Sequence, residues 1–147
     1  MYWRKQAMKI EFDDTLVTQN ELIDSQHKEL ISRIKQFVDS CGESGDKLKA
    51  IKMLDYLAEY TEFHFSAEEK LQEEVSYPGL KEHKQKHEEF KNTLRTLEEF
   101  LEESEGPTEA FVEKVQETVV TWLFNHIKGF DRSVAEYIFL VDNPNRL

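Results

Sequence analysis

Apolar residues recur at intervals of three and four along most of the chain, which is the period of an amphipathic α-helix. Glycine and proline cluster at residues 41–46, 76–79 and 104–107, and we interpret these clusters as loops. No stretch of any length alternates between apolar and polar residues as a half-buried strand would. The pattern therefore predicts four helices, over about residues 20–40, 46–75, 80–103 and 108–128.

Four helices joined by short loops favour an all-α fold, an up-down-up-down four-helix bundle. A chain of 147 residues is typical of one domain, and it buries enough surface to fold without a metal. We expect the bundle domain at residues 11–141, an N-terminal extension at 1–10 and a C-terminal tail at 142–147. Residues 11–17 are predicted as an extended lead-in, and residues 134–141 as a short apolar tail that packs over one end.

The composition bounds the location and the partners. The net charge of −11 argues against nucleic acid, because phosphate binding requires patches of Lys and Arg. A single cysteine, Cys41, leaves no partner for an internal disulfide and fits a reducing compartment. No apolar run approaches the roughly 20 residues of a membrane span, and the first ten residues lack the apolar segment of a signal peptide. We expect a cytoplasmic protein that inserts into no membrane.

Polar side chains with metal-ligand chemistry fall on the inward stripes of all four predicted helices. A lone histidine on such a stripe is more often a hydrogen-bonded core residue, and pairs spaced by four are common on helix surfaces. Together, however, so many polar groups in a core are costly unless something satisfies them, which predicts a metal centre. The seven candidate ligands are His27, His64, Glu68, His83, His87, His126 and Asp131.

The spacing of these residues supports one cluster. Counted from each predicted loop in an antiparallel bundle, they reach matching heights to within about one helical turn. Residues four apart share a helix face, so His64 with Glu68, like His83 with His87, can hold one metal or its neighbour. Asp131 follows His126 by five residues, and Gly129 between them could loosen the helix so that both reach metal.

The donor set limits the metal without fixing it. Five imidazoles suit iron, copper, nickel or zinc, and carboxylates favour the harder oxidation states of iron or manganese. If Glu68 and Asp131 both bridge two octahedral ions, together with an oxygen from solvent, one coordination position is left open. A single small ligand could then bind at one of the two metals.

These motifs resemble the hemerythrin family, and specifically its bacterial single-domain members. The likeness covers about residues 11–139. The stretches that carry it are Ile23–Leu30 (IDSQHKEL), His64–Glu69 (HFSAEE), Tyr77–Gly79 (YPG) with His83–His87 (HKQKH), and Trp122–Asp131 (WLFNHIKGFD).

The resemblance implies a non-haem di-iron centre that binds dioxygen reversibly. It assigns His83, His87 and His126 to the coordinatively filled iron, His27 and His64 to the open iron, and Glu68 and Asp131 to both as bridges. A solvent-derived oxo or hydroxo group would be the third bridge. O2 would bind at the open iron beside an apolar wall that excludes water. The residues that match this wall are Phe65, Trp122 and Leu123.

An oxygen carrier is the leading interpretation, with dioxygen as its ligand and a possible oxygen-consuming enzyme as the recipient. We expect a monomer without turnover. One alternative is a di-iron enzyme that reduces peroxide, O2 or nitric oxide, but every histidine is already a ligand, so its protons would have to come from Glu or Tyr. Another is an oxygen sensor that acts through a separate partner. A ferritin-like oxidase is disfavoured, because its Glu-x-x-His arrangement gives a carboxylate-rich centre.

Overall fold

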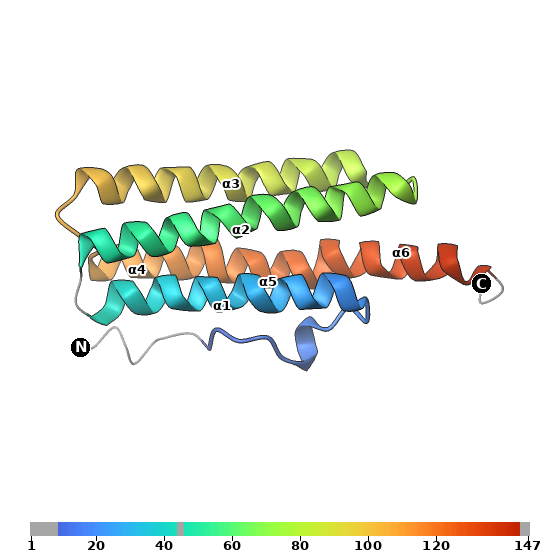
Figure 1. Ribbon diagram of the computed structural model, residues 1–147, viewed down its shortest axis with the longest axis horizontal. Helices are drawn as coiled ribbons and strands as arrows, with labels where there is room; N and C mark the ends of the chain where they lie inside the picture. The colour runs from blue at the N-terminus through green and yellow to red at the C-terminus, as the bar shows by residue number, and fades with distance from the viewer. Residues whose placement is uncertain (1–8, 44–45, 145–147) are drawn as a thin grey trace.

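The four predicted helices are present and run alternately up and down the molecule (Figure 1). A computed structural model describes residues 9–43 and 46–144, and these contain no strand. The first three long helices are α1 (Glu21–Glu43), α2 (Lys47–Glu74) and α3 (Leu80–Glu103). The fourth begins at Glu109 and ends at Asp142. The prediction of an all-α four-helix bundle is confirmed.

The fourth helix is continuous but is not α-helical throughout. It consists of α4 (Glu109–Val115), the π-helical segment η3 (Gln116–Thr121), α5 (Trp122–His126), the π-helical segment η4 (Ile127–Asp131) and α6 (Arg132–Asp142). The residues at the junctions keep helical torsion angles, for example φ −64° and ψ −38° at Arg132. The prediction of a helix end near residue 128 followed by a separate tail is therefore wrong. Residues 134–141 continue the helix, which extends past the other three (Figure 1).

Short polar side chains cap the N-termini of three of the four long helices. Asn20 Oδ1 accepts a hydrogen bond from the Ile23 backbone N–H at 3.0 Å. Asp46 and Thr108 do the same for N–H groups three residues later, at 3.2 and 3.1 Å. Each satisfies a donor that the first turn of a helix leaves without a partner.

The apolar stripes meet along the bundle axis in two clusters. The larger includes Phe37, Leu57, Phe90 and Val119, all inaccessible to solvent, and it fills most of the bundle. The smaller is built on Ile23, Val134 and Ala135 near the other end. The candidate ligands lie where these two clusters approach each other, so packed apolar residues border the polar centre.

The lead-in before α1 lies against the bundle. It contains one 3-10 turn, η2 (Asp14–Leu16), and Leu16 is buried in the core. Arg132 of α6 donates to the carbonyl oxygens of Thr15 and Val17 at 2.6 and 3.3 Å, which fixes this segment to the fourth helix. Ile10, which we assigned to the extension, is also buried in the core. The boundary of the extension stays a prediction, since residues 1–8 lie outside the described part.

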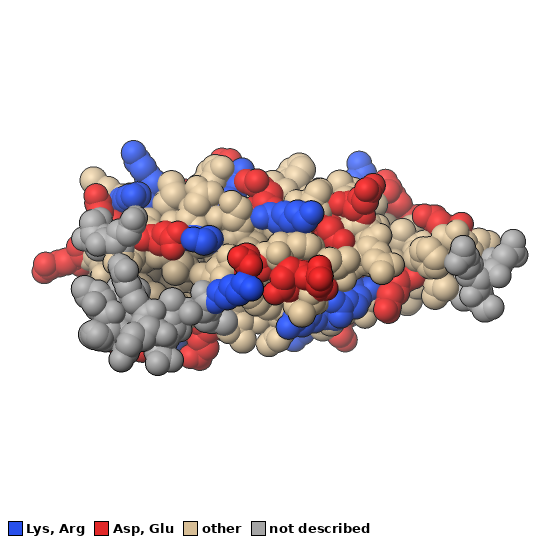
Figure 2. Space-filling model, turned by 90° about the horizontal axis from the view of Figure 1, so that it is seen from below, with Lys and Arg blue, Asp and Glu red and all other residues tan. Residues whose placement is uncertain are grey.

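The described surface carries charges of both signs. On the face shown in Figure 2, acidic and basic side chains are interspersed along the bundle. Among the described helices, none combines the length and the apolar character needed to cross a bilayer.

Candidate metal centre

The structure brings all seven candidate ligands together in the middle of the bundle. All are buried, and the most exposed of them, His126, retains only 6% of its accessible surface. They come from every long helix: His27 from α1, His64 and Glu68 from α2, His83 and His87 from α3, His126 from α5 and Asp131 from η4.

The ligand atoms form two groups that share both carboxylates. In each group, atoms of the members lie within 4.8 Å of one another. The two groups contain three and two histidines, which is the division that the resemblance implies. One group is Glu68, His83, His87, His126 and Asp131, and the other is His27, His64, Glu68 and Asp131.

The spacing of these atoms fits donors around octahedral ions. Two donors about 2.1 Å from one metal and at right angles to each other lie about 3.0 Å apart. Nε2 of His83 lies 3.0 Å from Nε2 of His126 and 3.0 Å from Oδ1 of Asp131. Oδ2 of Asp131 faces the other group and lies 2.8 Å from Nε2 of His27. Asp131 is thus placed to bridge two metals through its two oxygens.

Many of the candidate ligand atoms have no hydrogen-bond partner among the described residues. Although the His27–Asp131 approach is close, it lacks hydrogen-bond geometry, and several buried atoms have no hydrogen-bond partner in the described structure. Leaving so many polar atoms buried and unpaired costs considerable free energy. Cations between them would supply partners for all of these atoms except Nδ1 of His27, because each imidazole offers one nitrogen to a metal. The atoms are Nδ1 and Nε2 of His27, Nε2 of His64, Nε2 of His87, both oxygens of Glu68 and Oδ2 of Asp131.

Burial and crowding set the charge states of the metal-free site. Burial, together with repulsion from His27, lowers the pKa of His64 to about 3. Burial and the neighbouring His83 lower the pKa of His87 to about 2. Both imidazoles are therefore neutral at neutral pH, the form that binds metal.

The two carboxylates respond to burial in opposite ways. Burial and the nearby Asp131 carboxylate raise the pKa of Glu68 well above its usual range. Burial also opposes ionisation of Asp131, but contacts with the surrounding imidazoles, led by His126, hold its pKa well below the usual range. Without metal, the pair thus shares one negative charge, and two cations would favour the ionised form of both.

Asp131 reaches the cluster because of the π-helical segment η4. In a regular α-helix, residues five apart lie about 140° apart around the axis. The wider turn of η4 brings them to the same side, where Nε2 of His126 lies 3.2 Å from Oδ1 of Asp131. Single π turns within α-helices are frequent at functional sites. Gly129 lies inside this turn, and a Cβ added there would meet nothing within 4 Å.

Three polar residues that sequence reasoning missed contact the outer nitrogens of three of the five histidines. Gln26 Oε1 accepts from Nδ1 of His64 at 2.8 Å, and a carboxylate oxygen of Glu69 accepts from Nδ1 of His87 at 2.7 Å. Such bonds fix the tautomer that leaves Nε2 free for metal. Gln26 and Glu69 directly adjoin His27 and Glu68 in sequence, but adjacency to a ligand does not reveal which way a side chain turns.

Gln72 contacts the outer nitrogen of His83, with Nε2 of the amide 3.0 Å from Nδ1 of the imidazole. The amide oxygen of Gln72 is buried without a partner. With a metal on Nε2 of His83, Nδ1 carries a hydrogen, and a half-turn of the amide lets the oxygen accept it. Gln72 lies one turn after Glu68 on α2, which was the available signal for its position.

The residues of the implied apolar wall lie in different settings. Phe65 is buried and stacks on His87, with ring centroids 3.7 Å apart and planes 3° apart. Leu123 is completely buried. Trp122 is only partly buried and stacks on His126, with centroids 4.6 Å apart. Their role around bound O2 stays a prediction.

Known proteins resemble this chain over most of its length. A bacteriohemerythrin of Stenotrophomonas maltophilia (strain R551-3) is 31% identical over 118 residues, which are 80% of this chain and 74% of that protein. A myohemerythrin of Theromyzon tessulatum is 32% identical over 123 residues, covering 82% and 87% of the two chains. The crystal structure of a wild-type hemerythrin superposes with a TM-score of 0.74 at 22% identity, and covers 88% of this chain and 97% of that one.

The model of one protein family matches residues 18–138, the segment that contains all seven clustered ligands. That family is described as the hemerythrin HHE cation-binding domain. By this match and by its likeness to these relatives, the chain belongs to the hemerythrin family.

Proposed function

We propose that this protein binds dioxygen reversibly at a pair of non-haem iron ions. The observation that carries the proposal is the pair of buried groups with three and two histidines that share Glu68 and Asp131. Metals held in this way would be asymmetric, and the two-histidine metal would have an open position. The names of the bacteriohemerythrin and myohemerythrin relatives support the same assignment.

In this proposal each group of residues holds one ion. His83, His87 and His126 would hold the filled iron, His27 and His64 would hold the open iron, and Glu68 and Asp131 would serve both, together with a solvent-derived oxo or hydroxo group. The iron pair supplies the electrons and the vacant position that O2 requires. Five imidazoles suit both iron and zinc, so the donor set does not choose between them. Membership of the hemerythrin family favours iron.

The surrounding residues keep water and protons from the bound gas. Phe65 and Leu123 are fully buried, and apolar walls of this kind exclude solvent from a site. All five histidines belong to the cluster, so no other histidine is available as an acid or base. We therefore expect binding and release without turnover, in place of an enzyme that reduces peroxide, O2 or nitric oxide.

The cellular part of the proposal is a cytoplasmic monomer that releases oxygen to an oxygen-consuming enzyme. The net charge of −11 supports a monomer, because like-charged copies repel one another. Sedimentation equilibrium at physiological salt would measure the oligomeric state directly.

Visible absorption spectra test the proposal. The iron-loaded protein is reduced anaerobically, exposed to air and then deoxygenated, with zinc-loaded protein as the colourless control. A band that appears with air and fades on deoxygenation supports a reversible carrier. An irreversible ferric spectrum on the first exposure contradicts it and indicates redox turnover.

A further inference from the structure

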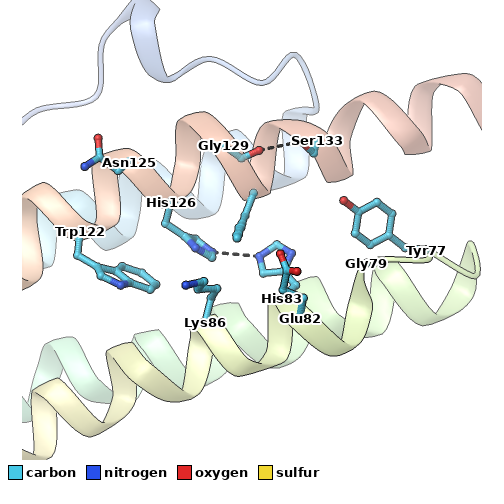
Figure 3. A pocket seen from close by; sticks show the side chains of 11 residues that line it. Tyr77, Gly79, Glu82, His83, Lys86, Trp122, Asn125, His126, Gly129 and Ser133 are labelled. Carbon is cyan, nitrogen blue, oxygen red and sulfur yellow. Dashed lines mark hydrogen bonds between the residues drawn. The ribbon is translucent and has the colours of Figure 1, made fainter.

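A groove of about 570 Å³ opens between α3 and the α5–η4 part of the fourth helix (Figure 3). Its volume lies in the range of small-molecule sites, about 300–1,000 Å³. Three aromatic side chains line it, Tyr77, Trp122 and Phe130, together with the polar Asn125 and Ser133. In Figure 3, Trp122 lies at one end of the groove and Tyr77 at the other.

Two members of the three-histidine group also line this groove. His83 and His126 point toward each other, with their Nε2 atoms 3.0 Å apart, and His126 is the most exposed of the seven clustered residues. The Trp122 indole stacks on the His126 imidazole with an angle of 12° between the planes. A molecule in the groove would therefore touch an aromatic system that is in direct contact with a metal ligand.

The position of the groove restricts what such a molecule can do. In the proposed centre, the metal held by the three histidines would have no vacant position, so an occupant of the groove could not bind it directly. An occupant could instead exchange electrons with that metal through the His126 imidazole and the Trp122 indole. An oxygen carrier whose iron pair is ferric and holds no O2 is inactive until the iron is reduced. The groove adjoins two of the metal ligands, His83 and His126, through which electrons could reach the iron.

We propose that this groove binds a planar aromatic electron donor, of the dihydroflavin or hydroquinone type, which reduces the ferric centre. The inference rests on the proposed di-iron function. In each step the donor loses one electron and one ferric ion becomes ferrous, while the proton of the donor goes to solvent. Two such steps restore the diferrous pair.

The lining favours an uncharged ring system over an inorganic anion. Apart from the histidines, the charged side chains that line the groove are one carboxylate, Glu82, and one ammonium, Lys86, so their charges cancel. Lys86 Nζ also lies 5.7 Å from the centre of the Phe130 ring, which it faces as a cation faces an aromatic ring. Aromatic walls bind flat rings by offset or edge-to-face stacking.

A titration of the metal-free protein tests binding. The chain has two tryptophans, so the substitution Trp3→Phe leaves Trp122 as the only one. Riboflavin, which absorbs where tryptophan emits, should then quench the fluorescence in a saturable way. Gly129→Leu adds a side chain at a position that lines the groove, and a Cβ there meets nothing within 4 Å. We expect it to weaken riboflavin binding by about tenfold or more.

Two further variants complete the titration. Ser133→Leu also adds bulk to the lining of the groove, and because Ser133 lies in α6 it tests the groove without altering the π turn. Gln36→Leu adds the same apolar side chain on the exposed face of α1, away from the groove, and should leave the affinity unchanged. Quenching that does not saturate with riboflavin concentration overturns the proposal. Equal riboflavin affinity in all three variants overturns it as well.

Reduction kinetics of the iron-loaded ferric protein test the electron transfer. The rate with photoreduced riboflavin should saturate with concentration and fall about tenfold in Gly129→Leu. The rate with hexaammineruthenium(II), which cannot stack, should change less than about twofold. Equal slowing with both donors overturns the groove as a donor site. Because the titration requires no metal, failure of the groove and failure of the di-iron function give different results.

Discussion

The Glu69 carboxylate lies 2.7 Å from Nδ1 of His87, on the side of the imidazole opposite the Nε2 atom that faces the carboxylate of Glu68. It is the only carboxylate among the outer hydrogen-bond partners of the clustered histidines that the structure describes. A carboxylate in this position orients the ring and raises its basicity as a ligand. The three-histidine site therefore has a support that the two-histidine site lacks.

Replacing Glu69 with Gln should weaken the three-histidine site. We expect metal affinity to fall by about tenfold, because a neutral amide raises the basicity of His87 less than a carboxylate does. The reduction potential of the iron pair should rise for the same reason. Competition with a coloured chelator measures the affinity. Glu74→Gln, an exposed position on the same helix, is the matched control, and equal effects of the two substitutions would contradict this role.

Glu68→Ala should abolish loading of two metals, because the Glu68 carboxylate belongs to both groups. Elemental analysis should show one metal per chain or fewer. The metal-free variant should remain folded, since the substitution removes two buried oxygens without partners. Thermal unfolding of the metal-free protein checks that point, and a variant that retains two irons and normal O2 binding would contradict the assignment.

Leu123→Tyr is expected to change the rates of O2 binding and release while metal content stays the same. Leu123 is completely buried, and overpacking a core typically costs about 1–3 kcal/mol. Leu101→Tyr, equally buried but near the far end of α3, should cost similar stability and leave the O2 kinetics unchanged. Stopped-flow mixing with O2 separates the two variants, and identical kinetics would remove Leu123 from the pocket.

Gly129→Ala should be tolerated. The Cβ meets no atom within 4 Å, and alanine in a helix interior is more stable than glycine by about 0.5–1 kcal/mol. We expect a small gain in the free energy of unfolding and full metal loading. Urea titration and elemental analysis measure both quantities. Loss of metal would show instead that glycine is needed to loosen the turn between His126 and Asp131.

The metal-free protein should lose stability as pH falls from about 6.5 toward 3. The pKa of His64 is about 3 and that of His87 about 2 in the folded state, against the usual 6.5, so the unfolded chain binds these protons first. The raised pKa of Glu68 works in the opposite direction but accounts for one proton against two. Urea titrations at several pH values measure the slope, and metal-free protein whose stability is flat between pH 6.5 and 4.5 would contradict it.

The sequence by itself determined the number of helices and the seven candidate ligands. Both follow from local rules, because a helical period of 3.6 places residues three and four apart on one face wherever the helix lies. The apolar stripes and the loops around Gly42, Pro78 and Pro107 then leave few ways to fold. The histidines stood out because unpartnered polar groups do not otherwise belong in an apolar stripe.

Tertiary structure alone decided which side chains meet from different helices. The outer partners Gln26, Glu69 and Gln72 were missed, because polar residues beside a ligand look the same in sequence whether they turn inward or toward solvent. The continuation of the fourth helix through Gly129 was also missed. A local rule takes glycine as a weak point, whereas contacts between Asp131 and the imidazoles of three other helix segments hold a π turn there. Long-range contacts outweigh local propensity at such positions, and only the folded bundle makes them.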